Sequence, residues 1–565
     1  MTFRTGLLLL GFLASITTSV SASAQTPDGN EANQNDITAA ESQARGVVSL
    51  VVRREPGVGS VADRVGAVIT ATWQNTEVIE VPASQAEAVE ALLQLLPGIE
   101  SVERDAVVST PDPEAAEAPD SSGPVTGQSS TTSASTGPND PRTRDQLWWR
   151  SVTDYAGASS VETAWARAET NERLRVVVVD GGFANHEDFS WRNGISLVDD
   201  GRGVFSYDAD SCDTYHGQSV ASIIGARTDN GTGMAGMLEA DIHPARVLAC
   251  DSSGHLYNVA RAIRWAAGED VGAGRTLPEP ADIVNLSLSA ETTCTSNLQA
   301  AIDTANQAGA LVVASAGNSR SDASGYAPAS CRGVVTVGAV TRDGDQTSFS
   351  NYGSALTVSA LGQQVRVQGP EDGHRWMSGT SFSAPIVSGI LGLIAQDIPE
   401  LERDTLLDLL SDAVTPLTSS SNPMGAGILN AARLQEQVAG LLGRDEPSLH
   451  HAMSVRTDGD GDSPFWSHVD EKRLCSLYEF DANERAETGV DYYSIFRVPQ
   501  GEALTMDNAE HVQSGESVRF VLSNPETAGY DFGLQFCSNE NGENCRSSEL
   551  IPLQTARLQA PARCR

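Results

Sequence analysis

Between residues 141 and 443, short runs of apolar residues alternate with segments whose apolar positions recur at helical spacing. Three of these runs are almost continuously apolar: 176–179, 283–286 and 311–314. Helical spacing is clearest in two segments, 258–267 and 298–307. Continuous apolar strands that alternate with helices predict an α/β domain, in which a doubly wound, mostly parallel sheet carries helices on both faces.

A second, smaller pattern covers residues 45–108. Its strands are expected at 47–52, 76–81 and 99–103. Before the last of them, residues 84–96 have the spacing of an amphipathic helix, with Ser84 as the expected N-cap. The segment therefore predicts a compact α+β unit, close to the size at which an isolated domain is only marginally stable.

The N-terminus has the pattern of a secretory signal. Arg4 precedes an apolar core at residues 7–13, and small residues end at Ala24 in an Ala-x-Ala site. We therefore expect residues 1–24 to be removed after export. No other stretch is long and apolar enough to cross a bilayer. The mature chain is expected to be soluble and secreted, extracellular or periplasmic, without a transmembrane anchor.

Two further segments differ from both patterns. Residues 109–140 are rich in Pro, Ser, Thr and Ala and have no apolar period, which predicts a flexible, protease-accessible linker. Residues 446–565 contain short alternating segments between turn signals, which are typical of a small β-rich domain. Within them, the acidic run 458–462 could ligate calcium through its carboxylates. It lacks the full calcium-loop pattern, so a solvated linker is the favoured interpretation.

Composition narrows the classes of partner. The chain of 565 residues is long enough for several domains, and its formal net charge is −37. Such a charge argues against nucleic acid and against an anionic membrane surface as partners. Eight cysteines in an exported chain indicate disulfides, with four from Cys212 to Cys331 and four from Cys475 to Cys564. The division predicts two separately cross-linked domains, and the C-terminal four allow three pairings.

The run 379–385 contains a serine flanked by small residues, directly before an apolar segment. There Ser381 would lie in the first turn of a buried helix, where the helix dipole and free N–H groups favour developing negative charge. A simple turn is the alternative, because Gly-Thr-Ser is common in turns. Ser381 is a candidate nucleophile only if a base, an orienting acid and an oxyanion donor accompany it.

Three other residues supply those groups. Asp180 follows the strand at 176–179, at the carboxyl end where catalytic groups of open α/β sheets gather. His216 heads a segment of small and apolar residues, so its ring can reach a neighbouring serine. Asn318 follows the strand at 311–314 through a glycine turn, and its amide can donate to an oxyanion. Taken singly, each is better interpreted as a structural residue of a turn or helix start.

Taken together, the four residues follow one another along the chain in the order Asp, His, Asn, Ser. In this order they resemble those of the subtilisin-like serine proteases, or subtilases, of peptidase family S8. The resemblance covers about residues 140–440 and points to a secreted bacterial type with a propeptide and a C-terminal extension. Three further motifs support it: 283–289, 348–353 and 425–427.

The resemblance implies a serine endopeptidase that acts on proteins or peptides through an acyl-enzyme. Ser381 would attack the scissile carbonyl, His216 would take the hydroxyl proton, and Asp180 would orient the imidazole. Asn318 would hold the oxyanion. Catalysis would need no cofactor. Structural calcium is common in such proteins, but the sequence places no ligands for it here.

The resemblance also assigns roles outside this group. Residues 45–108 would be a propeptide that inhibits the enzyme and is cleaved off during autocatalytic maturation. The implied substrate-binding residues are Ser287, Leu288 and Ser289. In the matching branch of secreted bacterial proteins, the implied disulfides are Cys212–Cys250 and Cys294–Cys331.

Three positions depart from the residues usual in this family. Gly181 stands where Ser or Thr is common, Gln218 and Ser219 stand where Thr and His are usual, and Ser289-Ala290 replaces a glycine pair. The first two departures can change the rigidity or hydrogen bonding of the triad. The third lies beside the expected specificity region, so substrate preference is not transferable from relatives.

Three other functions compete with a protease. An inactive, subtilase-like binding protein would be indicated by loss of a triad residue or of the oxyanion donor, and none is lost. The related serine-carboxyl peptidases use Glu where this chain has His216, which disfavours them. An adhesin-like protein, whose main function lies in residues 446–565, is left open by the sequence.

Overall fold

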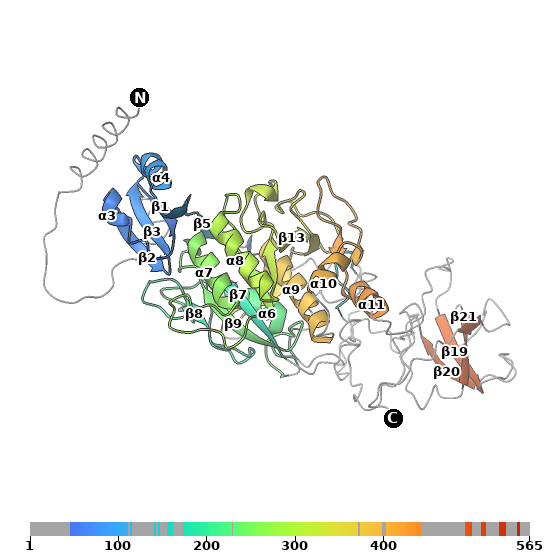
Figure 1. Ribbon diagram of the computed structural model, residues 1–565. Coiled ribbons are helices and arrows are strands. Elements are labelled where there is room, and N and C mark those ends of the chain that lie inside the picture. Colours follow the sequence, from blue (N-terminus) through green and yellow to red (C-terminus); the bar gives the residue numbers. More distant parts are fainter. Residues whose placement is uncertain are drawn as a thin grey trace. The chain divides into compact units, whose positions relative to one another are not determined.

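The structure is a computed structural model of the full chain, shown in Figure 1. It describes these residues: 46–110, 114–115, 140–142, 145–146, 155–161, 173–228, 230–370, 373–397, 403–441, 492–499, 510–515, 530–537 and 551–553. The signal expected at 1–24 and the acidic run 458–462 lie outside them. The chain divides into two units, Met1–Ala118 with Asp145–Leu434 and Pro119–Arg144 with Gln435–Arg565. No helix in the part of the chain that the structure describes is long and apolar enough to cross a membrane.

The first unit opens with a small α+β fold, which is blue in Figure 1. Its sheet is antiparallel, in the order β2-β3-β1-β4. The strands are β1 (Val47–Arg54), β2 (Val68–Trp73), β3 (Thr76–Pro82) and β4 (Ile99–Arg104), and the helices are α3 (Ala62–Val65) and α4 (Ala86–Gln94). Leu50, Ile79 and Leu93 are fully buried in its core. The strands and the helix expected from the sequence are therefore present.

The start of α4 differs from the prediction. The helix begins at Ala86 with Gln85 as its N-cap, and no side chain caps it. The expected cap, Ser84, lies in the turn that leaves β3, where the Gln85 N–H bonds to the Pro82 carbonyl at 2.8 Å. The N-cap prediction was wrong because this turn occupies the residues that a capping box would need.

The large sheet of the first unit contains nine described strands, in the order β17-β18-β14-β13-β12-β11-β7-β9-β8. Their bounds are β7 (Leu174–Asp180), β8 (Ile195–Ser196), β9 (Ala240–Arg246), β11 (Ile283–Leu286), β12 (Leu311–Ser315), β13 (Val334–Val340), β14 (Val358–Leu361), β17 (Val414–Thr415) and β18 (Ile428–Leu429). Only the pair β17–β18 is antiparallel. The chain continues from β7 to one side and later returns to its other side, so the sheet is doubly wound about β7.

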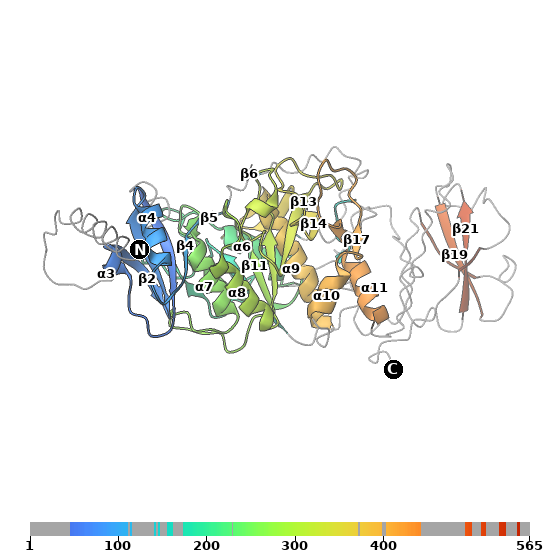
Figure 2. The same ribbon diagram turned by 45° about the horizontal axis from the view of Figure 1, so that its top comes forward.

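Helices cover both faces of this sheet, as Figure 2 shows. They are α6 (His216–Gly225), α7 (Leu256–Ala266), α8 (Ser296–Gln307), α9 (Thr380–Asp397) and α10 (Arg403–Leu409). The last helix, α11 (Ala431–Leu441), begins in the first unit and ends in the second. Val177 and Val179 share one core with the buried residues of α7 and α8. Asn285, whose side chain points to the other face of β11, accepts a hydrogen bond from Ser388 of α9 at 2.9 Å. The α/β prediction is confirmed.

Shorter strands lie at the carboxyl edge of the large sheet. They are β5 (Val107–Ser109), β6 (Glu114–Ala115), β10 (Ser253–His255), β15 (Val365–Gln368) and β16 (His374–Ser378). β5 pairs with β10, and β16 pairs with both β15 and β6, all antiparallel. The range expected to be a linker, 109–140, thus begins with residues that are paired in strands.

Beyond residue 441, the described residues form one antiparallel sheet, in the order β20-β19-β21-β22. Its strands are β19 (Tyr492–Pro499), β20 (Glu510–Gly515), β21 (Tyr530–Cys537) and β22 (Ile551–Leu553). Strands in this region agree with the β-rich pattern of the sequence.

Candidate active site

Asp180 and His216 face each other at the carboxyl edge of the large sheet. Asp180 is the last residue of β7, and His216 is the first residue of α6. The Nδ1 atom of His216 lies 2.9 and 3.0 Å from the two carboxylate oxygens of Asp180, and both side chains are buried. Among the described residues, Nε2 of His216 has no hydrogen-bond partner. The carboxylate thus orients the ring and leaves Nε2 free to accept a proton.

Glycines after Asp180 let the start of α6 approach β7. The Gly217 N–H donates to the Gly181 carbonyl at 2.6 Å. Gly182 has a φ of +69°, and a Cβ there would lie 2.5 Å from the carbonyl oxygen of Thr214. At Gly181 a Cβ would lie 2.7 Å from the Cβ of Leu248. Ser or Thr at this position would displace Leu248, which explains the departure at Gly181.

Ser381 lies in the first turn of α9 and is 2 % exposed. Its hydroxyl donates to the Ser287 carbonyl at 3.3 Å, and the Ser287 hydroxyl donates to the Ser381 carbonyl at 2.9 Å. The ring of the next residue, Phe382, is centred 5.6 Å from the His216 ring. The structure therefore brings the starts of α6 and α9 together. Among the described residues, no hydrogen bond joins the Ser381 hydroxyl to Nε2 of His216.

Asn318 is held in one orientation by Thr380. Its Oδ1 accepts hydrogen bonds from the Thr380 N–H at 2.9 Å and from the Thr380 hydroxyl at 2.8 Å. The Nδ2 group of Asn318 therefore points away from these donors, and a Cβ on Gly379 would lie 3.2 Å from it. The amide is thus a fixed N–H donor next to the residues that precede Ser381.

Thr380 and Asn351 support this site and were not predicted as site residues. Asn351 is fully buried, and its Oδ1 accepts the N–H groups of Ser319 and Ser321 at 3.0 and 2.9 Å. Its Nδ2 donates to the Ala316 carbonyl at 2.9 Å, so the amide binds the chain on both sides of Asn318. Thr380 and Asn351 both stand in motifs that carry the family resemblance. Neither motif, however, indicates which loop the side chain reaches.

Residues 287–289, expected to bind substrate, follow β11 and already pair with a peptide segment. The Ser109 N–H donates to the Ser289 carbonyl at 3.0 Å, and the Ser289 N–H donates back to the Ser109 carbonyl at 3.1 Å. Leu288 is fully buried in the core. The part of the first unit built on the large sheet, residues 145–434, is called the large domain below. Since β5 also pairs with β10, the segment ending at Ser109 lies between two backbone partners in this domain.

The residues around Ser109 are buried in this position. Val108 is fully buried in a core that includes Leu248 and Leu256. The Thr110 N–H donates to the Ser252 carbonyl at 3.3 Å, and Thr110 is 4 % exposed. An aliphatic side chain at position 108 is therefore enclosed by the large domain.

Beyond Thr110, the next described residues pair with the strand that leads to Ser381. Glu114 pairs with Ser378 and Ala115 pairs with Met377 of β16. β16 ends directly before the run that contains Ser381. The chain is thus paired with the large domain on both sides of residues 111–113.

Two disulfides connect described residues, and both confirm the pairing that the resemblance implied. They are Cys212–Cys250 and Cys294–Cys331, with Cα atoms 5.0 and 5.1 Å apart. Cys212 lies just before His216, and Cys250 lies just before β10. The first disulfide therefore ties the segment that enters α6 to a strand that binds peptide backbone.

A buried cation lies beside Asp180. Arg246 ends β9 in register with Asp180, and its side chain is fully buried. The guanidinium pairs with the carboxylate of Asp200, with Nη1 at 2.8 Å from Oδ1. Burial alone would raise the pKa of Asp200, but the hydrogen bonds from Arg246 and from the Arg202 N–H lower this pKa below its ordinary value.

Asp200→Asn is expected to destabilise the protein by about 2 kcal/mol, because it leaves the Arg246 guanidinium buried without a counter-charge. The folded-state pKa of Asp200 is lowered, so the contribution of the pair is complete above the ordinary aspartate pKa. It is lost as the pH falls through the folded-state pKa. Urea unfolding of both proteins in a Ser381→Ala background measures the difference. Equal stabilities near neutral pH, or a difference that does not shrink in acid, would contradict this role.

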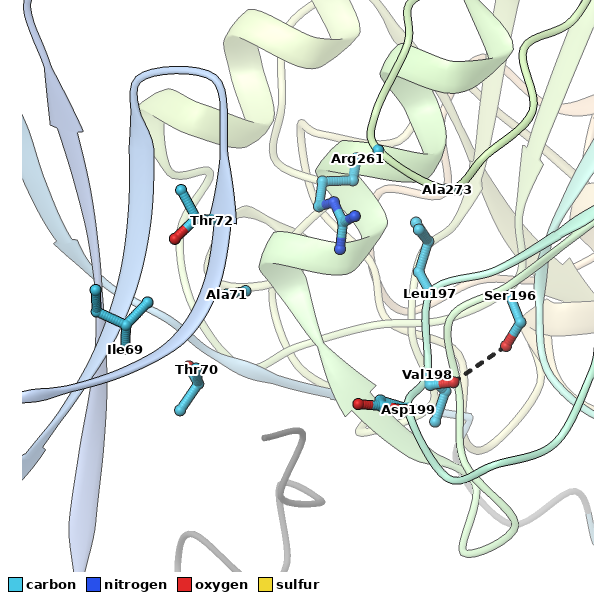
Figure 3. A pocket seen from close by; sticks show the side chains of 11 residues that line it. Ile69, Thr70, Ala71, Thr72, Ser196, Leu197, Val198, Asp199, Arg261 and Ala273 are labelled. Atoms are coloured by element: carbon cyan, nitrogen blue, oxygen red, sulfur yellow. Dashed lines mark hydrogen bonds between the residues drawn. The ribbon is translucent and has the colours of Figure 1, made fainter. Parts of the chain in front are cut away.

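A cavity of about 580 Å³ lies between β2 and the large domain (Figure 3), and neither Asp180, His216 nor Ser381 lines it. Thr70 and Thr72 line one side, and Asp199 and Arg261 line the other. It contains none of the residues that surround Ser381. Within the described ranges, no group of three or more His, Cys, Asp or Glu side chains is placed to hold a metal ion. Structural calcium therefore stays a prediction without ligands.

Comparisons with known proteins match this chain to one family of peptidases. Residues 172–427 match the model of the subtilase family of peptidases. An extracellular protease of Xanthomonas campestris is 32 % identical over 328 residues, which are 52 % of this chain and 56 % of that protein. Subtilisin BL of Lederbergia lenta is 30 % identical over 284 residues, which are 49 % of this chain and 96 % of that protein. A solved structure titled as proteases from Pseudoalteromonas arctica has 31 % identity and a TM-score of 0.49, covering 54 % of this chain and 99 % of that one.

The fold and the buried Asp180–His216 pair define a doubly wound α/β domain with a serine at the start of a neighbouring helix. The chain belongs to the subtilase family, because its match covers nearly the whole of Subtilisin BL. It spans just over half the length of the Xanthomonas campestris protein and of an extracellular basic protease from Dichelobacter nodosus, with 56 % and 57 % covered.

Proposed function

We propose that this chain is a secreted serine endopeptidase that hydrolyses peptide bonds through an acyl-enzyme. The observation that carries the proposal is the buried hydrogen bond between Asp180 and His216, next to the helix start that bears Ser381. The printed names of the similar proteins, extracellular proteases and subtilisins, support it.

In the proposed mechanism the hydroxyl of Ser381 attacks the scissile carbonyl while Nε2 of His216 takes its proton. Asp180 stabilises the imidazolium that results. Collapse of the tetrahedral intermediate breaks the C–N bond, and the amine leaves with the proton from His216. Water then attacks the ester by the same route and restores the Ser381 hydroxyl.

Two N–H groups would hold the oxyanion of the tetrahedral intermediate. One is the Nδ2 group of Asn318, which Thr380 fixes in orientation. The other is the backbone N–H of Ser381, which has no acceptor within α9 because it belongs to the first helical turn. Preorganised donors of this kind supply much of the stabilisation in acyl transfer.

Substrates would bind as an added antiparallel strand between residues 287–289 and β10. The pairing of Ser109 with Ser289 supports this mode, because a segment of the chain itself is bound in that way. The buried site of Val108 favours substrates with an aliphatic side chain at the equivalent position. Cleavage of a peptide library by the mature enzyme tests this preference.

Residues 45–108 would act as the inhibitory propeptide. Glu103 accepts the N–H groups of Ser296 and Asn297 at 3.1 and 3.2 Å, so its carboxylate caps α8. Asp105 accepts the Tyr257 N–H at 3.0 Å and caps α7. Carboxylates at helix N-termini are favourable because they meet free N–H groups and the positive end of the dipole.

The first processing cut would fall between Thr110 and Glu114. Thr110 is bound on one side of this segment, and Glu114 pairs with Ser378 on the other, so the described residues at both ends are held by the large domain. The rest of the region expected to be a linker would be trimmed later, since it is rich in Pro, Ser and Thr. Mass spectrometry of the released N-terminal fragment tests this position.

Glu103→Gln is expected to shorten the lag before activity appears by about tenfold. The reason is that the Glu103 carboxylate holds the small α+β fold of strands β1–β4 on α8, and a neutral amide makes this cap weaker. The lag is measured with a small chromogenic peptide after purified precursor is diluted. Glu100→Gln is the matched control, because the described ion pair of Glu100, with Arg53 at 2.7 Å, lies inside the small α+β fold. Equal lags for the two variants would show that Glu103 does not hold the unit in place.

Export would use the signal expected at residues 1–24, and the partners would be protein or peptide substrates and the chain's own propeptide. The acyl-transfer route assigns every proton transfer to side chains of the triad, so we propose that catalysis needs no cofactor. A chelator should therefore leave the initial rate of the mature enzyme unchanged, whatever its effect on stability.

Hydrolysis of a peptide library by the purified, processed chain tests the proposed function. Defined internal cleavages, absent from Ser381→Ala, are expected. If every peptide stays intact, the chain is an inactive binding protein of the same fold. If cleavage occurs but Ser381→Ala retains it, the assignment of the nucleophile is wrong.

A further inference from the structure

Gln218 occupies a buried position next to the proposed triad. It is the third residue of α6, two positions after His216, and it is fully buried. Its Oε1 accepts the Ala184 N–H at 3.1 Å, and its Nε2 donates to the Gly369 carbonyl at 2.7 Å. Both functions of the amide are thus satisfied by backbone groups of other segments.

These two bonds join the three segments that carry the proposed triad. Ala184 lies in the loop that follows Asp180, and Gln218 belongs to the helix that begins with His216. Gly369 directly follows β15, whose partner β16 runs into the turn before Ser381. One side chain therefore contacts the loop after the acid, the helix of the base and the strand pair that leads to the nucleophile.

Neighbouring serines strengthen only one of these connections. The Ser219 hydroxyl donates to the Gln368 carbonyl at 3.2 Å, and the Ser222 hydroxyl accepts the Gln368 N–H at 3.1 Å. Both bonds tie α6 to β15, and neither reaches the loop after Asp180. Backbone N–H groups of Gly217 and Gln218 also reach that loop, at the Gly181 and Gly182 carbonyls. Among the described hydrogen bonds, the one from Gln218 to Ala184 adds the side-chain connection between α6 and that loop.

We propose that Gln218 is a positioning residue, which holds the loop after Asp180 and the β15–β16 pair in register with His216. The inference rests on the proposed triad and adds to it a residue that does not touch substrate. The Gly369 carbonyl also accepts from the Gln368 side chain at 3.1 Å. Leaving the Ala184 N–H or the buried amide of Gln218 unpaired is nevertheless costly, so this side chain favours the one arrangement in which both bonds form. Displacing catalytic groups by an ångström can cost on the order of a hundredfold in rate.

This residue is a particular feature of the chain, because Thr is usual there in the family it resembles. A threonine hydroxyl is shorter than the glutamine amide and offers a single polar atom. It would have to make both bonds from that one oxygen, whereas the glutamine reaches Gly369 and Ala184 with two separate atoms. The departure from the family pattern therefore has a structural use.

The test compares Gln218→Met with Gln146→Met. Gln146 is also fully buried, and its amide also bonds to a backbone N–H and a carbonyl, both of Ala235, outside the triad segments. With active sites counted by a fluorophosphonate titration, Gln218→Met is expected to lower kcat about tenfold and to change KM less than about twofold. Gln146→Met is expected to lower the unfolding temperature similarly without that fall in kcat. Equal kcat values for the two variants would overturn the proposal.

A second variant keeps the proposal testable if Gln218→Met does not fold. Gln218→Glu keeps an acceptor for Ala184, but its ionised form places an oxygen against the Gly369 carbonyl. Burial favours the neutral acid, which can donate as the amide does. The kcat of Gln218→Glu relative to the parent should therefore rise as the pH is lowered, while that of Gln218→Met stays constant. A constant ratio for Gln218→Glu would contradict a positioning role.

Failure of the inference and failure of the proposed triad give different results. If the parent is not labelled at Ser381, the triad assignment is wrong and the comparison of kcat values loses its basis. If Ser381 is labelled and Gln218→Met retains the kcat of the control, only the positioning role is wrong.

Discussion

Ser381→Ala is expected to accumulate as a full-length precursor that hydrolyses peptides at least about 10⁴-fold more slowly than the parent. The variant lacks the nucleophile both for peptide hydrolysis and for the cut that would release the N-terminal unit. The substitution removes one hydroxyl, which donates only to the Ser287 carbonyl, so the fold should persist. Intact mass measurement and a chromogenic peptide assay, in a host without other proteases, give both results.

Ser383→Ala is the matched control for this experiment. Ser383 is buried in the same helical turn, and its hydroxyl donates to the Thr380 carbonyl at 3.0 Å. No described hydrogen bond joins Ser383 to His216 or to residues 287–289. We expect Ser383→Ala to mature and to retain activity. Normal maturation of Ser381→Ala would remove Ser381 from the mechanism.

Asn318→Ala is expected to lower kcat on the order of 10²–10³-fold with little change in KM, because the oxyanion donor acts mainly in the transition state. The assay is steady-state hydrolysis of one peptide substrate, normalised to titrated active sites. A larger rise in KM than fall in kcat would instead indicate a role in binding the ground state.

Asn318→Asp separates the donor from the support of the loop. The aspartate keeps an oxygen that accepts the N–H and hydroxyl of Thr380, but it has no N–H to offer. We expect its kcat to be as low as that of Asn318→Ala, or lower, because a carboxylate repels the oxyanion. An active Asn318→Asp enzyme would mean that Asn318 only supports Thr380.

Sequence patterns predicted the strands that are continuously apolar and the helices whose apolar positions recur at helical spacing. β11 (Ile283–Leu286) matches the expected strand, and α8 (Ser296–Gln307) begins two residues before the expected one. Asp180 and His216 were placed correctly at a strand end and a helix start, because both positions follow from the apolar runs beside them. Whether they act in catalysis stays a prediction.

Contacts between distant segments were beyond the reach of these patterns. The pairing of Ser109 with Ser289 and the cap of α8 by Glu103 join parts of the chain about 180–190 residues apart. Gln218 was visible only as an unusual neighbour of His216, since its role depends on where Ala184 and Gly369 lie in three dimensions. Periodicity specifies the face of an element, but not the partner that covers it.

The central claim is that Ser381 is the nucleophile activated by His216 and Asp180. The most direct measurement is tandem mass spectrometry of the processed protein after reaction with a fluorophosphonate. The account predicts one phosphonate adduct, located on Ser381, whose formation parallels the loss of peptidase activity. It also predicts no adduct in His216→Ala over the same time. An adduct on a different serine, or loss of activity without labelling of Ser381, would contradict it.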